Sequence, residues 1–398
     1  MTPKIYLKPG KDEFVRRFHP WVFSGAIQRT TGQPADGDVV EVLDRQENCL
    51  GFGHFHHGSI AVRMLTFEAA DLNAPEFWEQ RLRAAWAVRR TAGLTDAPAT
   101  DCFRLVHGEG DGFSGLVLDV YGSAVVLQCH SIGMHRQRAL IAQAVQQVLG
   151  GRLSAIFDKS KEALPAQYAE TVQPEYLFRR PDGDVSTGMV TENGVRFRVD
   201  WETGQKTGFF LDQRDNRQLL THFVRDKTVL NAFCYTGGFS CYALHAGALM
   251  VHSVDISAKA MELTAENAAL NAPFLGRHES SCADALRWLK DSEAMYDVVI
   301  VDPPAFAKSL DKRHNAVQGY KRLNQSALRR VASGGILFTF SCSQVVDRDL
   351  FYHTVAAAAM EVKRGVRVLH HLTQGADHPV SMFHPEGAYL KGLVLYVE

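Results

Sequence analysis

A cysteine near the end of an apolar run is the first residue of this chain that could do covalent chemistry. Residues 338–344 read FTFSCSQ and continue the apolar run GGIL, so Cys342 lies between two serines where a buried strand is expected to end. A cysteine there is either core filler or, at the open edge of a sheet, a nucleophile, because the thiolate is the reactive form of the side chain. The position alone favours neither interpretation.

A second motif, VDPPAF at residues 301–306, puts a carboxylate directly after another apolar run. Pro303 and Pro304 cannot continue a hydrogen-bonded ladder and have a fixed φ, so they stiffen the exit from the strand. We therefore expect Asp302 to project into a site beyond the strand and Phe306 to stack on a flat base. A Pro-Pro turn followed by a core phenylalanine is the alternative interpretation.

Residues typical of a nucleotide site come before these two motifs. The segment NAFCYTGGFS (residues 231–240) contains Gly237 and Gly238, which allow positive φ and a close approach of a ligand, and a helix is expected to follow. Asp255 ends the next strand and Asp284 the one after it, so the two acids could bind a ribose and an adenine amine. The glycines could instead form a structural turn and each acid could cap a helix. Their repetition at successive strand ends favours a ligand site.

Alternating strands and helices are expected to bring these residues to one edge of a sheet. After about residue 190, the runs KTVLNAF, VHSVDIS, YDVVIVDPP and GGILFTFSCS alternate with helical stretches, which predicts a parallel α/β sheet. Open sheets of this kind bind ligands beyond the carboxyl ends of their strands. The final runs VRVLHHL and YLKGLVLYVE have no helix between them and are expected to pair antiparallel. The missing GxGxxG pattern disfavours a nicotinamide dehydrogenase.

Two smaller domains are expected before this sheet. Residues 1–72 contain short apolar runs broken by Gly and Asp, which indicates a small β-barrel. Residues 73–188 combine a helix, a hairpin and further strands, which indicates a small α+β domain. The third domain is then 189–398.

The composition is that of a globular protein of 398 residues, with 46% hydrophobic and 22% charged residues and a net charge of -1. Basic residues gather in 1–31 and 305–330, where they could form a phosphate-binding face or an ordinary solvated surface. The 7 cysteines have no CxxC spacing, so we expect no disulfide framework and no metal. No apolar run could span a bilayer and no secretory signal is visible, so we expect a cytoplasmic protein without a membrane partner.

The order of the motifs resembles a known enzyme class. NAFCYTGGFS, VDIS, ADAL, VDPPAF and FTFSCS follow one another as in class I S-adenosylmethionine (SAM)-dependent methyltransferases. GQKTGFFLDQR at 204–214 and HPWVFSGAI at 19–27 are similar to the RlmI type of bacterial 23S rRNA cytosine-carbon-5 methyltransferases, and the resemblance extends over essentially the whole chain. It implies an α/β protein with a PUA-type β-barrel that binds RNA, a central α+β domain and a C-terminal Rossmann-like methyltransferase domain. It also implies SAM as cofactor, S-adenosylhomocysteine (SAH) as product and 23S rRNA as partner, and leaves a homodimer open.

The resemblance also implies roles for individual residues. Cys342 and Asp302 would be catalytic: the thiolate adds to carbon 6 of cytosine and makes carbon 5 nucleophilic toward the methyl group. The implied cofactor-binding residues are Phe210, Gln213, Arg214, Asn231, Phe233, Tyr235, Thr236, Gly237, Gly238, Asp255, Ile256, Asp284, Ala285 and Asp302. The implied substrate-binding residues are Pro303, Pro304, Phe306 and Lys308, and the last of these could be a cation that assists the thiol.

Three alternatives remain open. Amino-group methyltransferases need no cysteine and have an aromatic residue directly after [DN]PP, whereas Ala305 occupies that place here. Many cytosine-carbon-5 RNA methyltransferases have a second cysteine at the position of Ala305. This chain therefore has no obvious residue there to assist elimination of the thiol in the carbon-5 mechanism. The same thiol chemistry could methylate carbon 5 of uridine. A non-catalytic RNA-binding module with a vestigial cofactor fold is the third alternative.

Overall fold

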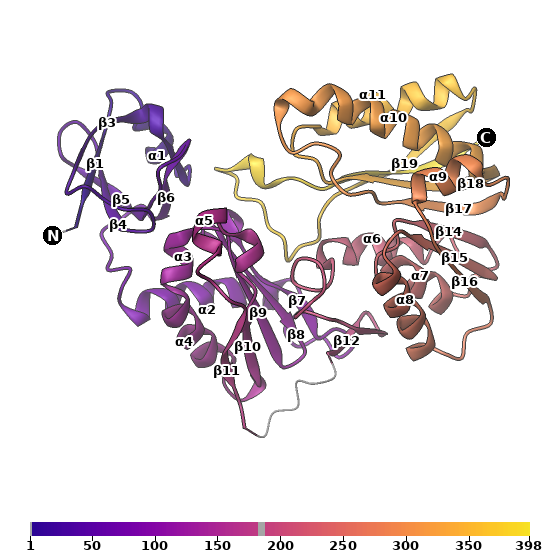
Figure 1. Cartoon of the computed structure of the whole chain (residues 1–398), viewed down its shortest axis with the longest axis horizontal. Coiled ribbons are helices and arrows are strands. Elements are labelled where there is room, and N and C mark those ends of the chain that lie inside the picture. The colour runs from indigo at the N-terminus through magenta and orange to yellow at the C-terminus, as the bar shows by residue number, and fades with distance from the viewer. Residues whose placement is uncertain (1, 182–187) are drawn as a thin grey trace. The chain divides into compact units, whose positions relative to one another are not determined.

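The structure of the chain, a computed structural model, describes residues 2–181 and 188–398 (Figure 1). Its contacts divide the chain into two compact units. The first unit consists of Met1–Val190, Val199–Leu211 and Ala376–Gly387, and the second of Thr191–Arg198, Asp212–Gly375 and Ala388–Glu398. The division into three domains with boundaries at 72 and 188 stays a prediction.

The first unit begins with a six-stranded sheet in the order β2-β6-β5-β4-β1-β3. Apolar side chains on one face, such as Ile5, Val40, Val42 and Val62, form a buried core, which explains why these short strands curl instead of lying flat. The elements are β1 (Lys4–Leu7), α1 (Glu13–Arg16), β2 (Trp21–Phe23), β3 (Ile27–Thr31), β4 (Val39–Leu43), β5 (Cys49–Phe55) and β6 (Ile60–Thr66).

A five-stranded sheet in the order β11-β10-β9-β8-β7 forms the rest of the first unit. The expected hairpin joins β8 and β9, and Gly122 adopts a φ of 59° in its turn. Helices α2 and α4 cover the sheet with an apolar layer that includes Trp78, Leu82 and Val145. The elements are α2 (Pro75–Thr91), β7 (Cys102–His107), β8 (Leu116–Tyr121), β9 (Ala124–Cys129), α3 (Ile132–Arg136), α4 (Arg138–Leu149), β10 (Ala155–Asp158), α5 (Ala166–Ala169) and β11 (Glu175–Arg179).

A two-stranded hairpin, β12 (Met189–Glu192) and β13 (Val195–Arg198), comes before a seven-stranded sheet in the order β16-β15-β14-β17-β18-β20-β19. Strands β14 to β18 are parallel, and β20 pairs antiparallel with both β18 and β19. The antiparallel pairing of β19 with β20 was expected from the missing helix between them. The strands are β14 (Thr228–Ala232), β15 (Met250–Asp255), β16 (Arg277–Cys282), β17 (Tyr296–Val301), β18 (Val331–Ser341), β19 (Val366–Leu372) and β20 (Lys391–Val397).

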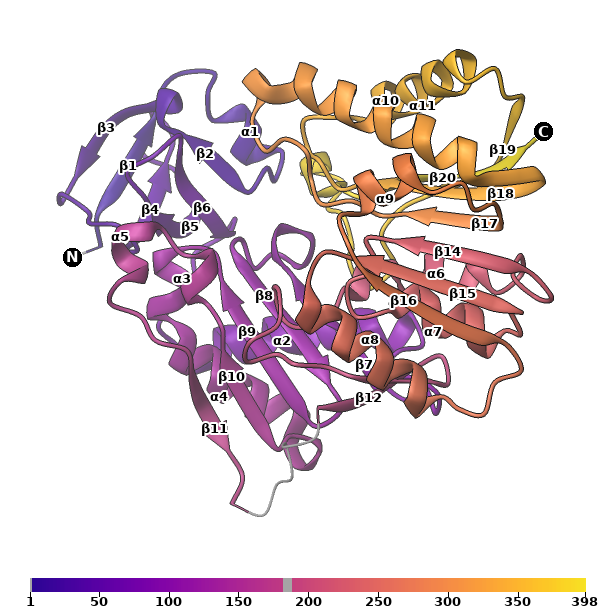
Figure 2. The ribbon, with the colours of Figure 1, turned by 45° about the vertical axis from the view of Figure 1, so that its right-hand side comes forward.

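Helices cover both faces of this sheet (Figure 2). On one face, α9 (Ala285–Asp291), α10 (Arg313–Arg330) and α11 (Arg348–Glu361) pack on the sheet through an apolar layer. On the other face lie α6 (Arg214–Leu220), α7 (Gly238–His245) and α8 (Ala258–Leu270). The alternating pattern predicted a parallel α/β sheet, and the structure adds that the helices lie on both of its faces.

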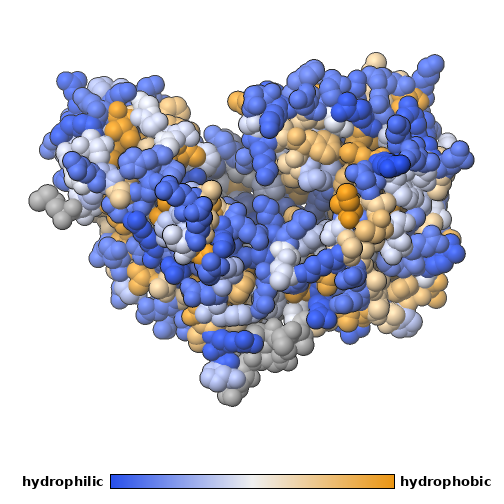
Figure 3. Space-filling model, in the orientation of Figure 1, coloured by the Kyte–Doolittle hydropathy of each residue, from blue (hydrophilic) through white to orange (hydrophobic). Residues whose placement is uncertain are grey.

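In the described parts of the chain, every helix is too short or too polar to cross a membrane. Hydrophilic residues cover most of the face drawn in Figure 3, with smaller hydrophobic patches among them.

Candidate active site at the carboxyl edge of the seven-stranded sheet

The register of the parallel strands brings the predicted residues to one edge of the sheet. Ala232, at the end of β14, is paired with Val254 of β15 on one side and with Val301 of β17 on the other. Val301 is paired in turn with Thr339 of β18. The strand order reverses between β14 and β17, and open α/β sheets bind ligands at such a reversal. Asp255 is the last residue of β15, and the loops after β14, β17 and β18 carry Gly237, Asp302 and Cys342, respectively.

The loop after β14 has an unusual backbone. Phe233, Tyr235 and Gly237 have φ angles of 62°, 47° and 80°, in the left-handed region that costs a residue other than glycine about 1 kcal/mol. Two side chains of α8 hold the loop: Thr264 Oγ1 donates to the carbonyl of Tyr235 at 2.8 Å, and Asn267 Nδ2 donates to that of Thr236 at 2.9 Å. Backbone strain that is fixed by neighbouring side chains is typical of a loop shaped for a ligand.

This loop also has unpaired polar atoms suited to the amino-acid part of SAM. Asn231 Nδ2 donates to Ser240 Oγ at 2.8 Å, but its Oδ1 is buried and has no hydrogen-bond partner among the described residues. The buried Thr236 Oγ1 likewise has no partner there. Both atoms belong to predicted cofactor residues, and a bound amine or carboxylate would satisfy them. The residues present therefore fit the predicted cofactor.

The Asp255 carboxylate accepts hydrogen bonds from the main chain of two segments, the loop after β14 and the start of the segment after β15. Its Oδ2 accepts from the Tyr235 N–H and its Oδ1 from the Ser257 N–H, both at 3.0 Å. Ser257 Oγ caps α8, so Asp255 is not needed as the helix cap. Each carboxylate oxygen has a second lone pair, which could accept from a ribose hydroxyl. The neighbouring Ile256 is 71% exposed and offers an apolar surface for a flat base.

Asp284 is exposed and accepts from the Arg287 N–H at 2.8 Å, as the N-cap of α9. Asp284 thus caps the helix, which was one of its two possible roles. Ala285 is the buried first residue of that helix. Binding of adenine by Asp284 and Ala285 stays a prediction.

Asp302 is partly exposed and is held by a residue from a different predicted motif. Gln213 Nε2 donates to Asp302 Oδ2 at 3.0 Å, and Asn216 Nδ2 fixes the amide of Gln213 by donating to its Oε1 at 2.7 Å. Burial of the carboxyl, together with the negative charge of Asp212, raises the pKa of Asp302 from its ordinary 3.8 to about 7. Asp302 can therefore both give and accept a proton near neutral pH.

The turn that carries Cys342 is bonded to the loop after β17. Ser343 Oγ donates to the carbonyl of Ala307 at 2.6 Å, and the Ser343 N–H donates to Ser341 Oγ at 3.3 Å. Cys342 itself is half-buried. The turn after β18 and the loop that carries Asp302 are thus fixed to each other.

Burial and, to a smaller extent, the charges of Asp302 and Asp212 raise the pKa of the Cys342 thiol to about 11, whereas the charge of Lys391 acts to lower it. The thiol is therefore protonated at neutral pH. If Cys342 reacts as a thiolate, a nearby group must take its proton.

Sequence reasoning missed three residues around the thiol. Asp212 accepts from the hydroxyl of Tyr389 at 2.6 Å through Oδ2, and its buried Oδ1 has no hydrogen-bond partner among the described residues. Tyr320 is fully buried, and the charges of Cys342 and Asp302 contribute to raising its pKa to about 12, after the larger effect of burial. Lys391 is the third. Asp212 could have been found, because it lies within the motif GQKTGFFLDQR, but the other two carry no local signal.

The remaining predicted residues are more dispersed. Phe306 is partly buried and packs on Tyr320 with ring centroids 4.6 Å apart, so the core role that was open for it is present. The other residues have these positions: Phe210 belongs to the first unit, Arg214 is buried at the start of α6, Gly238 is buried at the start of α7, Pro303 is buried, and Pro304 and Lys308 are exposed. Their functional roles stay predictions.

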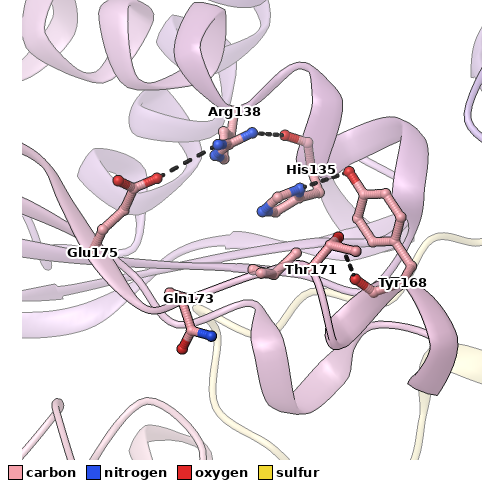
Figure 4. A pocket seen from close by; sticks show the side chains of 7 residues that line it. His135, Arg138, Tyr168, Thr171, Gln173 and Glu175 are labelled. Atoms are coloured by element: carbon pink, nitrogen blue, oxygen red, sulfur yellow. Dashed lines mark hydrogen bonds and ion pairs between the residues drawn. The ribbon is translucent and has the colours of Figure 1, made fainter.

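A cavity of about 370 Å³ in the first unit is lined mainly by polar side chains (Figure 4). His135 Nδ1 lies 3.0 Å from the hydroxyl of Tyr168, and Arg138 lies between Glu175 at 3.5 Å and Asp158 at 3.4 Å. Because these charges neutralise one another, we assign no chemistry to this cavity.

His19, His384 and Glu386, also in the first unit, have potential metal-binding atoms within 4.8 Å of one another. The Glu386 carboxylate is 3.7 Å from His19 Nε2 and 3.8 Å from His384 Nε2. Ligand atoms of a tetrahedral zinc site are closer, at roughly 3.3 Å, as follows from zinc–ligand distances of about 2.0 Å. We propose no metal there.

The chain matches the family model of S-adenosylmethionine-dependent methyltransferases over residues 142–379 and the PUA-like domain model over residues 5–67. The ribosomal RNA large subunit methyltransferases I of Shewanella denitrificans and Alteromonas mediterranea are each 38% identical to it. The alignments cover 100% of this chain in both cases, and 100% and 99% of the two relatives.

Solved structures agree in fold. A candidate methyltransferase in complex with SAH superposes with a TM-score of 0.84 at 21% identity, and a candidate SAM-dependent methyltransferase from Streptococcus mutans with a TM-score of 0.83 at 22% identity. Both comparisons cover the whole of each chain. The family models and the full-length relatives together cover both units of the chain. The chain therefore belongs to the ribosomal RNA large subunit methyltransferase I family, as a SAM-dependent methyltransferase with an N-terminal PUA-like domain.

Proposed function

We propose that the protein methylates carbon 5 of a cytosine in 23S rRNA and that Cys342 is the nucleophile. Two full-length relatives are named for the RNA of the large ribosomal subunit, which supports this class of substrate. The observation that carries the chemistry is the bond between Ser343 and Ala307, because it joins the turn with Cys342 to the loop with Asp302. The charge of Asp302 also acts on the thiol, and addition to a pyrimidine ring requires a thiol with a carboxyl group near it.

The cofactor fits the loop after β14. Asn231 and Thr236 would bind its amino-acid part, and Asp255 its ribose. When bound, SAM supplies a methyl group on a positively charged sulfonium, and SAH is released after carbon 5 has taken the methyl group.

Asp302 takes the first proton. The thiol proton passes to the Asp302 carboxylate, whose raised pKa makes it a suitable acceptor near neutral pH. The Cys342 sulfur then forms a bond to carbon 6 of cytosine, and Asp302 returns the proton to ring nitrogen 3. The electron pair from the ring double bond becomes available at carbon 5, which is otherwise a poor nucleophile.

Release of the product needs a second acceptor. After methylation the proton on carbon 5 must leave, and its electron pair re-forms the ring double bond as the carbon–sulfur bond breaks. We assign this proton to Asp212, whose charge acts on both Asp302 and Cys342 and whose Oδ1 has no hydrogen-bond partner among the described residues. Nitrogen 3 gives its proton back to Asp302, which returns it to the thiolate, and Asp212 loses its own proton to water.

A trapping experiment tests the nucleophile and the base together. Fluorine at carbon 5 cannot leave as a proton, so 23S rRNA fragments transcribed with 5-fluorocytidine should hold the protein in a covalent adduct that survives denaturing electrophoresis. We expect the adduct with the wild type and with the control Cys49→Ser, an exposed cysteine of the first unit, but not with Cys342→Ser. Asp212→Asn should accumulate adduct on unmodified RNA.

The result also separates the alternatives. An adduct only with 5-fluorouridine would make uridine the target. Methyl transfer by Cys342→Ser at the wild-type rate, with the methyl group on an exocyclic amine, would replace the proposal by amino-group methylation. No binding of SAM in calorimetry would favour a non-catalytic RNA-binding module.

A further inference from the structure

Lys391 is a buried lysine at the start of an apolar strand. It is the first residue of β20 and only 5% exposed, and burying an ammonium group is costly unless it is hydrogen-bonded. Its Nζ donates to the carbonyl oxygens of Ser343 at 2.6 Å and Val346 at 2.7 Å. Across the described residues it forms no ion pair with a carboxylate. The cation is therefore held by main-chain carbonyl groups.

Both carbonyl groups belong to the turn that carries the thiol. Ser343 directly follows Cys342, and Val346 closes the same turn through a hydrogen bond from its N–H to the Ser343 carbonyl at 3.3 Å. On the other side of the thiol, Ser341 is paired with Lys391 across β18 and β20. Lys391 thus contacts the chain on both sides of Cys342.

We propose that Lys391 is a positioning residue for Cys342: its ammonium group holds the turn and its charge stabilises the thiolate. This inference deepens the function proposed above and rests on it, because it gives the lysine a role through the nucleophile. It replaces Lys308, which is exposed, as the cation that assists the thiol.

The charges around the sulfur explain why a cation is needed. Asp302 and Asp212 both disfavour the thiolate, and Tyr320 is an uncharged phenol at neutral pH. Asp347 and Arg348 act on Lys391 from the turn and from α11, in opposite directions. Lys391 is thus the cation that opposes the two carboxylates.

The charge of Lys391 is present at neutral pH. Burial lowers the pKa of Lys391 to about 8, although the charge of Cys342 partly opposes this effect. The coupling is reciprocal, since each charged form favours the other. Below pH 8 most of the lysine is an ammonium ion, so its effect on the thiol is available where the enzyme is expected to work.

Alkylation of Cys342 measures this effect without RNA. Iodoacetamide reacts with the thiolate, and peptide mass spectrometry separates Cys342 from the exposed Cys49 and Cys282. We expect Lys391→Met to slow alkylation of Cys342 about tenfold at pH 7, where most of the lysine is an ammonium ion. Lys391→Arg keeps the charge and should restore most of the rate. Lys290→Met, at an exposed position on α9, should behave as the wild type.

The inference would be overturned if Cys342 in Lys391→Met were alkylated at the same rate as in the wild type at every pH, while the melting temperature and the affinity for SAM were unchanged. If Lys391→Met does not fold, Lys391→Gln replaces it, with the same expected slowing and the same contrary result. The alkylation rate of Cys342 does not depend on whether the protein transfers a methyl group, so it tests the inference separately from the proposed function. If Cys342→Ser keeps methyl-transfer activity, the proposed function fails, whereas the alkylation profile still reports how Lys391 acts on the thiol.

Discussion

Gln213 and Asp302 are 89 residues apart in the chain, yet the side-chain amide of one donates to the carboxylate of the other at 3.0 Å. Asn216 donates to the Oε1 of Gln213, so the amide nitrogen is the atom that faces Asp302. This contact joins the motif GQKTGFFLDQR to the motif VDPPAF. In the proposed mechanism Gln213 therefore positions Asp302, in addition to its predicted contact with the cofactor.

Gln213→Ala should shift the pH dependence of methyl transfer upward. The hydrogen bond favours the charged carboxylate and lowers the pKa of Asp302, so its loss lets burial raise this pKa further. We expect the inflection in the pH profile of kcat to rise by about half a unit to one unit. Gln325→Ala is the control, at a half-buried position of α10 where the amide donates to Glu361. Equal inflections for Gln213→Ala and the wild type would contradict this prediction.

Asp302→Asn should make the protein more stable at high pH. The pKa of Asp302 is about 7 in the folded protein and near 3.8 in the unfolded chain, so ionisation costs folding free energy as the pH rises from 4 to 7. The amide avoids this cost. Because Asp302 is partly exposed, we expect a melting temperature only about 2–4 °C above the wild type at pH 8, and no difference at pH 4. Asp311→Asn, at an exposed position, should show no such pH dependence, and a wild type that is more stable than Asp302→Asn at pH 8 would refute the prediction.

Gly237→Ala should weaken binding of SAM. Gly237 has a φ of 80°, and an added Cβ would lie 2.8 Å from Thr264 Cγ2, so the loop must shift. A strain of about 1–2 kcal/mol corresponds to roughly tenfold weaker binding in calorimetry. Gly247→Ala is a matched control, because its φ is 90° but its Cβ would meet only Arg225 Cγ at 3.9 Å. It should lose stability but keep its affinity for SAM. Equal affinities in both variants would count against the loop as the cofactor site.

Arg217→Met should destabilise the second unit. Arg217 donates two hydrogen bonds of 2.8 Å to Glu192, and both side chains are buried. Removing the arginine leaves the buried Glu192 carboxylate without its cationic partner and with a hydrogen bond from the Tyr242 hydroxyl at 3.0 Å, which costs about 3–5 kcal/mol. We expect the melting temperature to fall by roughly 10 °C. Arg277→Met breaks a pair whose side chains are 73% and 40% exposed, and it should change stability by less than about 0.5 kcal/mol. Similar losses in the two variants would contradict the argument.

The arrangement of the second unit could be predicted because its signals are local. Apolar runs such as residues 298–301 alternate with amphipathic helices, and the two prolines after Asp302 mark the end of a strand. The same reasoning identified the strand-end residues Gly237 and Asp255, since position in a parallel sheet determines which edge they share.

The electrostatics around the thiol could not be predicted in this way. Lys391 follows Leu390 in an apolar run and looks like a residue at the edge of the sheet, and only the pairing of β20 beside β18 brings it to the turn after Cys342. Asp284 shows another limit of prediction from the sequence. Its position was compatible both with a helix cap and with a ligand contact, and the structure contains the cap.

The path of the chain near its end has a practical consequence. Ala376–Gly387 belongs to the first unit, whereas β20, which follows, occupies a place between β18 and β19 in the second. A fragment that begins at Asp212 would keep all seven strands of the sheet, but it would also carry 376–387 without the rest of the first unit. A truncation before residue 391 would leave β18 with an open edge and remove the lysine, so a minimal catalytic version of this protein would have to be engineered with a new connection in place of 376–387.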